Sequence, residues 1–402
     1  MRPARTTNWS VPTIMLLGFV LALGGLVPAA SAKSVNQSYP VPENGVLKVT
    51  GRGYGHGHGM SQYGARGAAR QGLNWKQILA FYYPGTKRGA TASEIRVLIT
   101  ADTSAPVAVR WTKGLRVRDL ASGKEYKLPE KKGVKRWRLR PDGVRNVIAY
   151  HDGKWRPWRT LPGLAEFHAG AEPVTLILPG GVTRAYRGAL RAVPPSANSG
   201  DRDTVNVLSI DDYIKGVVPA EMPATWERPA VRAQAVAART YAAWSRATRS
   251  SQGWQICDTT ACQVYGGVAS EHPSANNAVD ATAGVILRYD GKPAFTQFSS
   301  SSGGRTSAGS VPYLVSQADP YEKTSGNPYT NWNVELKAAT IERAYPTLGK
   351  LKSIKVTSRE GAGQWKGRVW TLVLKGTKKD VTVTGDDFRF KFGLRSTWFT
   401  FK

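Results

Sequence analysis

The stretch Gly216–Ala242 reads GVVPAEMPATWERPAVRAQAVAARTYA, and its second half predicts the central helix of the fold. We expect this helix from about Pro229 to Arg246, because proline suits the first helical turn and alanine is the strongest helix former. Its alanines form an apolar stripe narrow enough for close packing. Arg232, Arg239 and Arg246 recur every seven residues and therefore share another face of the helix.

The first half of the same stretch carries the candidate catalytic group. Glu221 is a single carboxylate in an apolar run between Pro219 and Pro223. Desolvation raises the pKa of a carboxylate, and a protonated acid can donate to a leaving oxygen at neutral pH. The alternative is an ordinary, partly exposed glutamate at a strand-to-helix turn. The neighbouring Asp211 and Asp212 are expected to end a strand and to be structural.

Glycosidases generally use two carboxylates at a set distance. One glutamate is enough if the substrate supplies its own nucleophile, as the C6 hydroxyl of a muramic acid can do by attacking its own C1. The same glutamate would then donate one proton and take one back. Such chemistry is a lytic transglycosylation, and it needs no metal.

The flanking chain predicts a strand-rich α+β fold around the Ala-rich core helix. Short alternating apolar runs recur from Ile95 to about Ile210 at strand-like spacing, and Met60–Ala80 predicts a helix. Within the β region, Lys131–Arg159 is rich in Lys, Arg and Trp. We expect a basic β insertion or exposed hairpin there, suited to carbohydrate or anionic surfaces, with a solvated β-arm as the alternative. Further strands are expected at 285–289, at 294–298 and from 351 onward.

The first residues predict export from the cell. Arg2 and Arg5 precede an apolar run that ends at Ala30-Ser31-Ala32, in the order typical of a secretory signal peptide. No later segment approaches the ~20 apolar residues that a spanning helix needs. The formal net charge of +28 implies an anionic partner. For an exported protein this partner is expected among the carboxylates and phosphates of the bacterial wall, and not to be a nucleic acid.

Further motifs continue the stretch quoted above. They are Cys257-Asp258, Cys262–Gly267, Phe298–Thr306, Asn327-Pro328-Tyr329 with Trp332, and Phe392–Ser396. Together these motifs resemble the SpoIID/LytB proteins, that is, the stage II sporulation protein D type lytic transglycosylases and the related amidase enhancers. The resemblance covers nearly the whole chain after the signal peptide, outside the basic insertion.

The resemblance implies a secreted cell-wall enzyme that cleaves MurNAc–GlcNAc bonds of peptidoglycan glycan strands and leaves 1,6-anhydro-MurNAc ends, with Glu221 as acid and base. A fixed cation suits a lactyl carboxylate, and glycine lets a backbone approach a sugar ring closely. The positions expected to line the groove are Arg239, Tyr241, Gln263, Tyr265, Ser302 and Gly303. The other function that stays open is a non-catalytic, wall-binding enhancer, with an N-acetylmuramoyl-L-alanine amidase as partner.

One departure from the family pattern concerns metal binding. Some relatives hold zinc with Cys and His ligands beside this groove, but here Ala261 and Ser299 stand at frequent His positions. Two cysteines alone do not make a tetrahedral site. We therefore expect a disulfide or free thiols at Cys257 and Cys262, with no metal or other cofactor.

A second departure concerns the order of the motifs. The block Gly53–Ala65, GYGHGHGMSQYGA, resembles one usually found after the segment that is here Gly393–Ser396. Circular permutation explains this order, and it predicts that residues 47–86 pack beside residues 385–402. Within the block, one His, with His56 as the candidate, or Gln62 is expected to touch the substrate cleft. The expected organisation is a signal peptide (1–32), a Gly-rich segment packing on the main domain (33–90), a β-rich region with the basic insertion (91–200) and the catalytic core (201–402).

Overall fold

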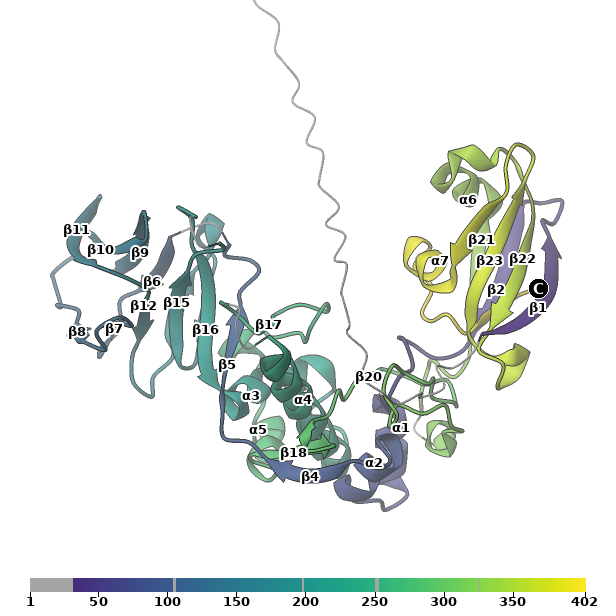
Figure 1. The fold of residues 1–402 in the computed structure, drawn as a ribbon, viewed down its shortest axis with the longest axis horizontal. Helices are drawn as coiled ribbons and strands as arrows, with labels where there is room; N and C mark the ends of the chain where they lie inside the picture. The colour runs from purple at the N-terminus through teal and green to yellow at the C-terminus, as the bar shows by residue number, and fades with distance from the viewer. Residues whose placement is uncertain (1–31, 104–105, 197–198, 250–252, 325) are drawn as a thin grey trace, which may run out of the picture.

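The structure of the chain, a computed structural model, describes residues 32–402 except 104–105, 197–198, 250–252 and 325. The predicted signal peptide lies outside the described residues, apart from Ala32. Figure 1 shows an elongated molecule, with a β-rich lobe at each end and helices between them. The expected strand-rich α+β fold class is confirmed. Among the described helices, none combines the length and the apolar character that crossing a membrane requires.

The first lobe is built from two antiparallel sheets of the predicted β region. One sheet has the order β17-β5-β16-β15-β12-β7-β8, and the other has the order β11-β10-β9-β6-β13-β14. Their apolar faces share one core, to which Trp137 contributes from one sheet and Phe167 from the other. The strands of the first sheet are β5 (Glu94–Leu98), β7 (Arg116–Asp119), β8 (Glu125–Lys127), β12 (Ala165–His168), β15 (Ala189–Val193), β16 (Asp203–Ser209) and β17 (Ile256–Cys257). Those of the second are β6 (Val107–Arg110), β9 (Arg136–Asp142), β10 (Arg145–His151), β11 (Trp155–Leu161), β13 (Val174–Ile177) and β14 (Thr183–Tyr186).

The helical middle is centred on the predicted Ala-rich helix, which is confirmed as α4 (Arg228–Thr248). Its alanines at 233, 235, 237 and 238 are fully buried, which lets neighbouring elements approach closely. The helices α1 (Gln62–Arg70), α2 (Trp75–Tyr82), α3 (Ile210–Glu221) and α5 (Pro273–Asp280) all contact it. A small sheet of β4 (Lys87–Ala90), β18 (Val285–Tyr289) and β19 (Lys292–Pro293) completes this part.

The second lobe combines the first described strands with the end of the chain, around a core of its own. One sheet has the order β1-β22-β23-β24 and another the order β21-β2-β25. Their strands are β1 (Lys33–Pro40), β2 (Val46–Gly51), β21 (Trp332–Lys337), β22 (Leu351–Arg359), β23 (Val369–Gly376), β24 (Val381–Thr384) and β25 (Phe399–Phe401), with helices α6 (Ala338–Ala344) and α7 (Gly385–Lys391).

Three local expectations were wrong. The helix expected at Met60–Ala80 is two helices, because Asn74 caps α2 with its own side chain and so begins a new helix. Asp211 and Asp212 do not end a strand; β16 ends at Ser209, and both acids lie in the first turn of α3. The strand expected at 294–298 is absent from the described structure except for β20 (Phe298–Ser299), which pairs with β3 (Met60–Ser61).

The contact predicted between the N-terminal block and the chain end is present for part of the block. Strand β2 pairs with β25, and the N–H of Gly55 donates to the carbonyl of Arg395 at 2.9 Å. Helices α1 and α2, at the end of the block, contact α4 instead. The permutation itself stays a prediction.

A buried carboxylate, Glu322, joins the N-terminal block to the later chain. It accepts hydrogen bonds from the Ser61 hydroxyl, from the Ser302 backbone N–H at 2.6 Å and from the Ser301 hydroxyl at 2.9 Å. The Asn327 amide donates to the same carboxylate. Glu322 is 1% exposed, so these donors have little access to water as a substitute acceptor.

Replacement of Glu322 by alanine is expected to destabilise the protein by about 3 kcal/mol, because several buried donors lose their acceptor together. The midpoint of chemical denaturation, followed by tryptophan fluorescence, measures this loss. Glu335→Ala is the matched control, since Glu335 is an exposed residue of β21. Equal midpoints for the two variants would contradict the proposed contribution of Glu322 to holding the N-terminal block against the later chain.

Candidate active site

Glu221 is the last residue of α3, a helix that also contains Pro219. The Val264 backbone N–H donates a 2.9 Å hydrogen bond to its Oε1 atom. Burial raises the pKa of Glu221 above its usual value, and the bond from Val264 opposes this shift only in part. Glu221 is therefore placed to keep a proton at a pH at which exposed glutamates are ionised.

Glu221 faces a cavity of about 460 Å³ between the helical middle and the N-terminal block. Among the described residues that line this cavity, Glu221 is the one acid. Aromatic rings and small polar groups form the rest of the wall. The lining residues are Tyr54, Gly55, His56, Gln62, Glu221, Tyr241, Thr260, Ala261, Cys262, Gln263, Gln297, Phe298, Ser299 and Ser300.

The glycine block reaches the cavity because its backbone lies directly against another segment. Gly55 has a φ of +104°, and a Cβ atom there would lie 2.7 Å from the Cβ of Ser299. A larger residue fits neither this conformation nor this distance. The glycine thus brings His56 and Tyr54 to the wall of the cavity.

His56 lines the cavity as a neutral ring. Burial, and after it the proximity of His58 and of two arginines, lowers the pKa of His56 to about 3. Its Nδ1 atom accepts a hydrogen bond from the His58 backbone N–H at 2.9 Å. One ring nitrogen is therefore occupied by the protein itself, and the lowered pKa makes His56 a neutral wall residue and not a second acid at the cavity.

Of the predicted groove residues, Tyr241, Gln263 and Gln62 also reach the cavity. The Gln263 amide is already used: it donates to the Ala238 carbonyl at 3.2 Å and accepts from Tyr213 at 3.3 Å. Gln62 donates to the Gln234 side chain at 3.4 Å. The two glutamines therefore shape the wall, whereas Tyr241 presents an aromatic ring to it.

The structure corrects the expectation for Arg239, which does not line the cavity. Its side chain is fully buried and makes an ion pair with Asp211 at 2.6 Å. It also donates to the carbonyls of Val279 and Val285, at 3.1 and 3.2 Å. Arg239 thus connects α4 to the start of α3, to α5 and to the start of β18, and it has no access to a sugar.

Tyr265 is the second correction. It is 3% exposed, and its hydroxyl donates to the Asn206 side chain at 2.9 Å. Its ring packs against Gly216 of α3, where an added Cβ would come within 2.6 Å of it. Tyr265 therefore packs against α3, the helix that carries Glu221, and does not line the cavity.

Ser302 and Gly303 are the third correction, since both are buried away from the cavity. The Ser302 hydroxyl oxygen lies 3.0 Å from a carboxyl oxygen of Asp319 and 3.0 Å from one of Glu322, and its hydrogen is shared between them. Gly303 has a φ of +74°, and a Cβ there would lie 2.7 Å from the Gly53 backbone nitrogen. The small residues allow one backbone to approach another backbone, and not a sugar ring.

Asp319 and Glu322 are a buried acid pair that the sequence analysis does not predict. Burial, and after it the charge of Glu322, raises the pKa of Asp319 to about 7. The Tyr82 hydroxyl donates to Asp319 at 2.9 Å. Their segment, Ala318–Lys323, carries no apolar pattern that marks it as buried, so only the fold reveals the pair.

Cys257 and Cys262 form a disulfide in the structure, and Cys262 lies at the cavity wall. Their sulfur atoms bind each other and are not available as thiolate ligands. Among the described residues, no cluster of three or more His, Cys, Asp or Glu side chains is arranged to hold a metal ion.

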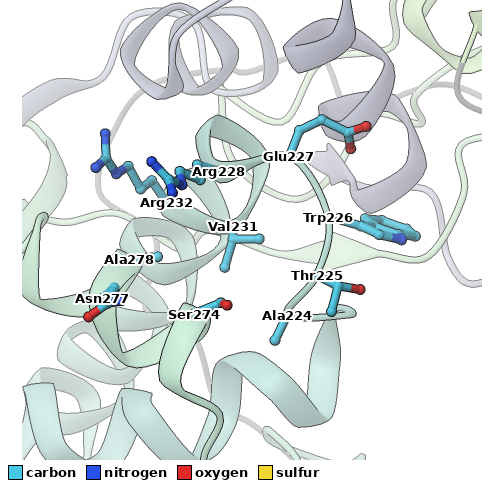
Figure 2. Close-up of a pocket in the computed structure, with 10 residues that line it drawn as sticks. All are labelled: Ala224, Thr225, Trp226, Glu227, Arg228, Val231, Arg232, Ser274, Asn277 and Ala278. Carbon is cyan, nitrogen blue, oxygen red and sulfur yellow. The ribbon is translucent and has the colours of Figure 1, made fainter.

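A second cavity, of about 470 Å³, lies along the segment that joins α3 to α4 (Figure 2). Its one acid among the described lining residues, Glu227, is paired with Arg66 and Arg70 of α1, at 3.2 and 2.5 Å. Burial alone would raise the pKa of Glu227, but the hydrogen bonds from Arg70 and Arg66 lower it below its usual value. Glu227 is thus an ionised partner of arginines, in contrast to Glu221.

Comparison with known proteins supports the predicted resemblance. Residues 198–289 match the family model described as "SpoIID: Stage II sporulation protein". The chain is 36% identical over 175 residues to the amidase enhancer of Bacillus subtilis (strain 168), covering 42% of this chain and 23% of that protein. It is 30% identical over 225 residues to the stage II sporulation protein D of Bacillus amyloliquefaciens, covering 50% of this chain and 62% of that protein.

The SpoIID resemblance is therefore confirmed, and the matched segment contains α3, Glu221 and α4. The chain spans less than two thirds of the length of these relatives.

Replacement of Arg239 by alanine is expected to destabilise the fold by about 3–5 kcal/mol, because it leaves Asp211 and two carbonyls without their partner. Thermal unfolding followed by circular dichroism measures this effect. Arg246→Ala is the control on the same helix, since Arg246 is exposed. A variant that keeps the wild-type melting temperature but loses affinity for glycans would restore the groove role of Arg239.

Proposed function

We propose that this chain is a peptidoglycan lytic transglycosylase, with Glu221 as its acid and base. The observation that carries the proposal is a lone, half-buried carboxyl group with a raised pKa at the wall of a cavity. Hydrolysis by two carboxylates would need a second acid several Å away across the substrate. A mechanism in which the substrate provides the nucleophile needs only one.

The proposed reaction proceeds in two proton transfers. Protonated Glu221 donates its proton to the glycosidic oxygen as the bond from that oxygen to C1 of MurNAc breaks. The C6 hydroxyl oxygen of the same MurNAc then bonds to C1, and its proton passes to the Glu221 carboxylate. The products are a GlcNAc-terminated strand with a free 4-hydroxyl and a 1,6-anhydro-MurNAc end, and Glu221 is protonated again.

The environment of the carboxyl group suits these steps. Val264 fixes Oε1 through its backbone N–H, while within the described structure Oε2 makes no hydrogen bond with the protein. The carboxyl group is thus oriented through one oxygen and can exchange its proton through the other. The proposed reaction uses no metal or other cofactor.

Aromatic side chains around the cavity support a saccharide as its ligand. Tyr54, Tyr241 and Phe298 line the wall, and Tyr54 is 42% exposed. Aromatic rings combine a broad apolar face with a polar edge, which suits sugar rings with their alternating C–H and hydroxyl groups. The excess positive charge of the chain favours approach to an anionic wall. The protein is accordingly proposed to act after export, at the cell wall.

A second candidate function is the enhancement of a wall amidase without glycan cleavage. Its support is the similarity to the amidase enhancer of Bacillus subtilis. An enhancer would use the same cavity for binding only, and the proton on Glu221 would then have no role. The two functions therefore differ in their response to Glu221→Gln. Glycan cleavage needs the proton on Glu221, whereas enhancement of an amidase does not.

Glu221→Gln is expected to lower the rate of glycan cleavage by at least about 10²–10⁴-fold, because an amide cannot serve as the proton donor. Mass spectrometry of purified glycan strands counts the 1,6-anhydro ends after incubation. Glu227→Gln is the matched control, because Glu227 is an ion-paired acid outside the Glu221 cavity. If neither wild type nor variant forms anhydro ends and both stimulate an amidase equally, the enhancer function replaces the enzyme.

The pH profile of cleavage tests the protonation state directly. Because Glu221 must be protonated to donate, activity is expected to persist above pH 4.5 and to fall as pH rises through its raised pKa. Initial rates on purified strands between pH 4 and 9 measure the alkaline limb. If activity is lost with a midpoint at or below the usual pKa of a glutamate, the result would contradict the proposed role.

A further inference from the structure

The exposed face of the sheet β11-β10-β9-β6-β13-β14 carries a cross-strand row of cationic and aromatic side chains. Arg110 of β6 pairs with Arg136 of β9, Arg136 with His151 of β10, and His151 with Trp155 of β11. Directly opposed residues of antiparallel strands point to the same face. The four side chains therefore form one continuous row across four strands.

Contacts between the side chains confirm this row. An Arg136 Nη atom lies 3.2 Å from the His151 ring, and the His151 and Trp155 ring centroids are 5.1 Å apart. The Arg138 guanidinium lies 4.2 Å from the centre of the Trp155 ring. Arg138 and Arg140 follow Arg136 at every second position of β9 and so extend the same face along the strand.

Within the described part of the chain, the arginines of this face have no acidic partners. Among the described residues, Arg110, Arg136, Arg138 and Arg140 form no ion pair, although the acids of the neighbouring hairpins do pair. Asp142 bonds to Arg145 at 2.7 Å and Asp152 to Arg156 at 2.6 Å. Opposed like charges such as Arg110 and Arg136 disfavour the folded sheet. A ligand of opposite charge would remove this repulsion.

Protection of a sheet edge does not explain these arginines. Charges often protect an edge strand from pairing with other chains, and β11 is such an edge, with Pro157 within it. The arginines, however, lie on β6 and β9, which have a neighbouring strand on each side. Their charge therefore lies on the face of the sheet and does not protect its edge.

We infer that the face formed by Arg110, Arg136, Arg138, Arg140 and Trp155 binds a linear, phosphodiester-linked wall polymer. An arginine guanidinium can donate two parallel hydrogen bonds to the oxygens of one phosphate. A row of arginines at the spacing of neighbouring strands therefore suits a polymer whose phosphates recur at short intervals. The choice of a wall polymer rests on the predicted export of the chain. Figure 1 places β9–β11 at the far end of the first lobe, away from α3, the helix that ends at Glu221.

This position separates attachment from the proposed cleavage. A polymer held at the distal sheet leaves the Glu221 cavity open to a glycan strand. Attachment would raise the local concentration of the protein at the wall without adding a contact in the cavity. The inference goes beyond the proposed function and does not depend on cleavage at Glu221.

The test measures binding to immobilised poly(glycerol phosphate) over a series of salt concentrations. The triple variant R110Q/R136Q/R138Q is expected to bind at least tenfold more weakly. The slope of log affinity against log salt concentration is negative. Counterion release predicts that its magnitude decreases by about two when three phosphate contacts are lost. K124Q/K127Q/K379Q removes the same charge from exposed positions elsewhere and is expected to stay within twofold of wild type.

Several outcomes would overturn the inference. They are wild-type affinity in the triple variant, an equal loss in the lysine control, tighter binding to duplex DNA than to poly(glycerol phosphate), and equal binding to phosphate-free glycan strands. Melting temperatures show whether each variant is folded, and the pair R110Q/R136Q, at two exposed residues, repeats the test with a milder change. Cleavage of short soluble glycans by the triple variant separates failure of this inference from failure of the proposed function.

Discussion

The arrangement of the cavity depends on the hydrogen bonds that the buried Glu322 carboxylate accepts. Its donors are Ser61 of the N-terminal block, the adjacent Ser301 and Ser302, and Asn327. A carboxylate without water must be satisfied by such donors, because an unpaired buried charge is costly. The same network therefore fixes Ser61 and the segment before it, which carries His56 and Tyr54 to the cavity wall.

This constraint explains how residues distant in sequence build one site. The acid comes from α3, the aromatic wall comes from α4 and from the Phe298 segment, and the opposite wall comes from the glycine block. Glu322 acts at the junction of the last two, where β3 pairs with β20. The cavity is thus a property of packed segments, and not of the Glu221 motif alone.

The sequence predicted the elements whose signals are local. The Ala-rich helix, the β region and the raised pKa of Glu221 follow from composition, spacing and flanking prolines, and all three hold in the structure. Side-chain direction was less predictable. Arg239 has the sequence context of an exposed helix face, yet α3 and α5 pack over that side of α4 and bury it. Only the tertiary arrangement distinguishes an arginine that binds Asp211 from one that binds a ligand.

Tyr265 and Ser302 show the same limit in another form. A motif position next to a cavity can serve the ligand or serve the backbone that surrounds it, and both roles demand the same residue type. Tyr265 supports α3, and Ser302 binds the buried acids. Val264, in contrast, acts on Glu221 through its backbone N–H, which leaves no signal in the side chain.

Helix α3 carries carboxyl groups in two different settings, at its first turn and at its last residue. Asp211 and Asp212 lie in its first turn, where the positive end of the helix dipole stabilises an anion, and Asp211 is ion-paired there. Glu221 is at the last position, where the unpaired carbonyl groups present negative partial charge. This charge acts in the same direction as burial and disfavours ionisation. The same helix therefore carries an ion-paired aspartate in its first turn and, at its last residue, a carboxyl group whose pKa is raised by burial.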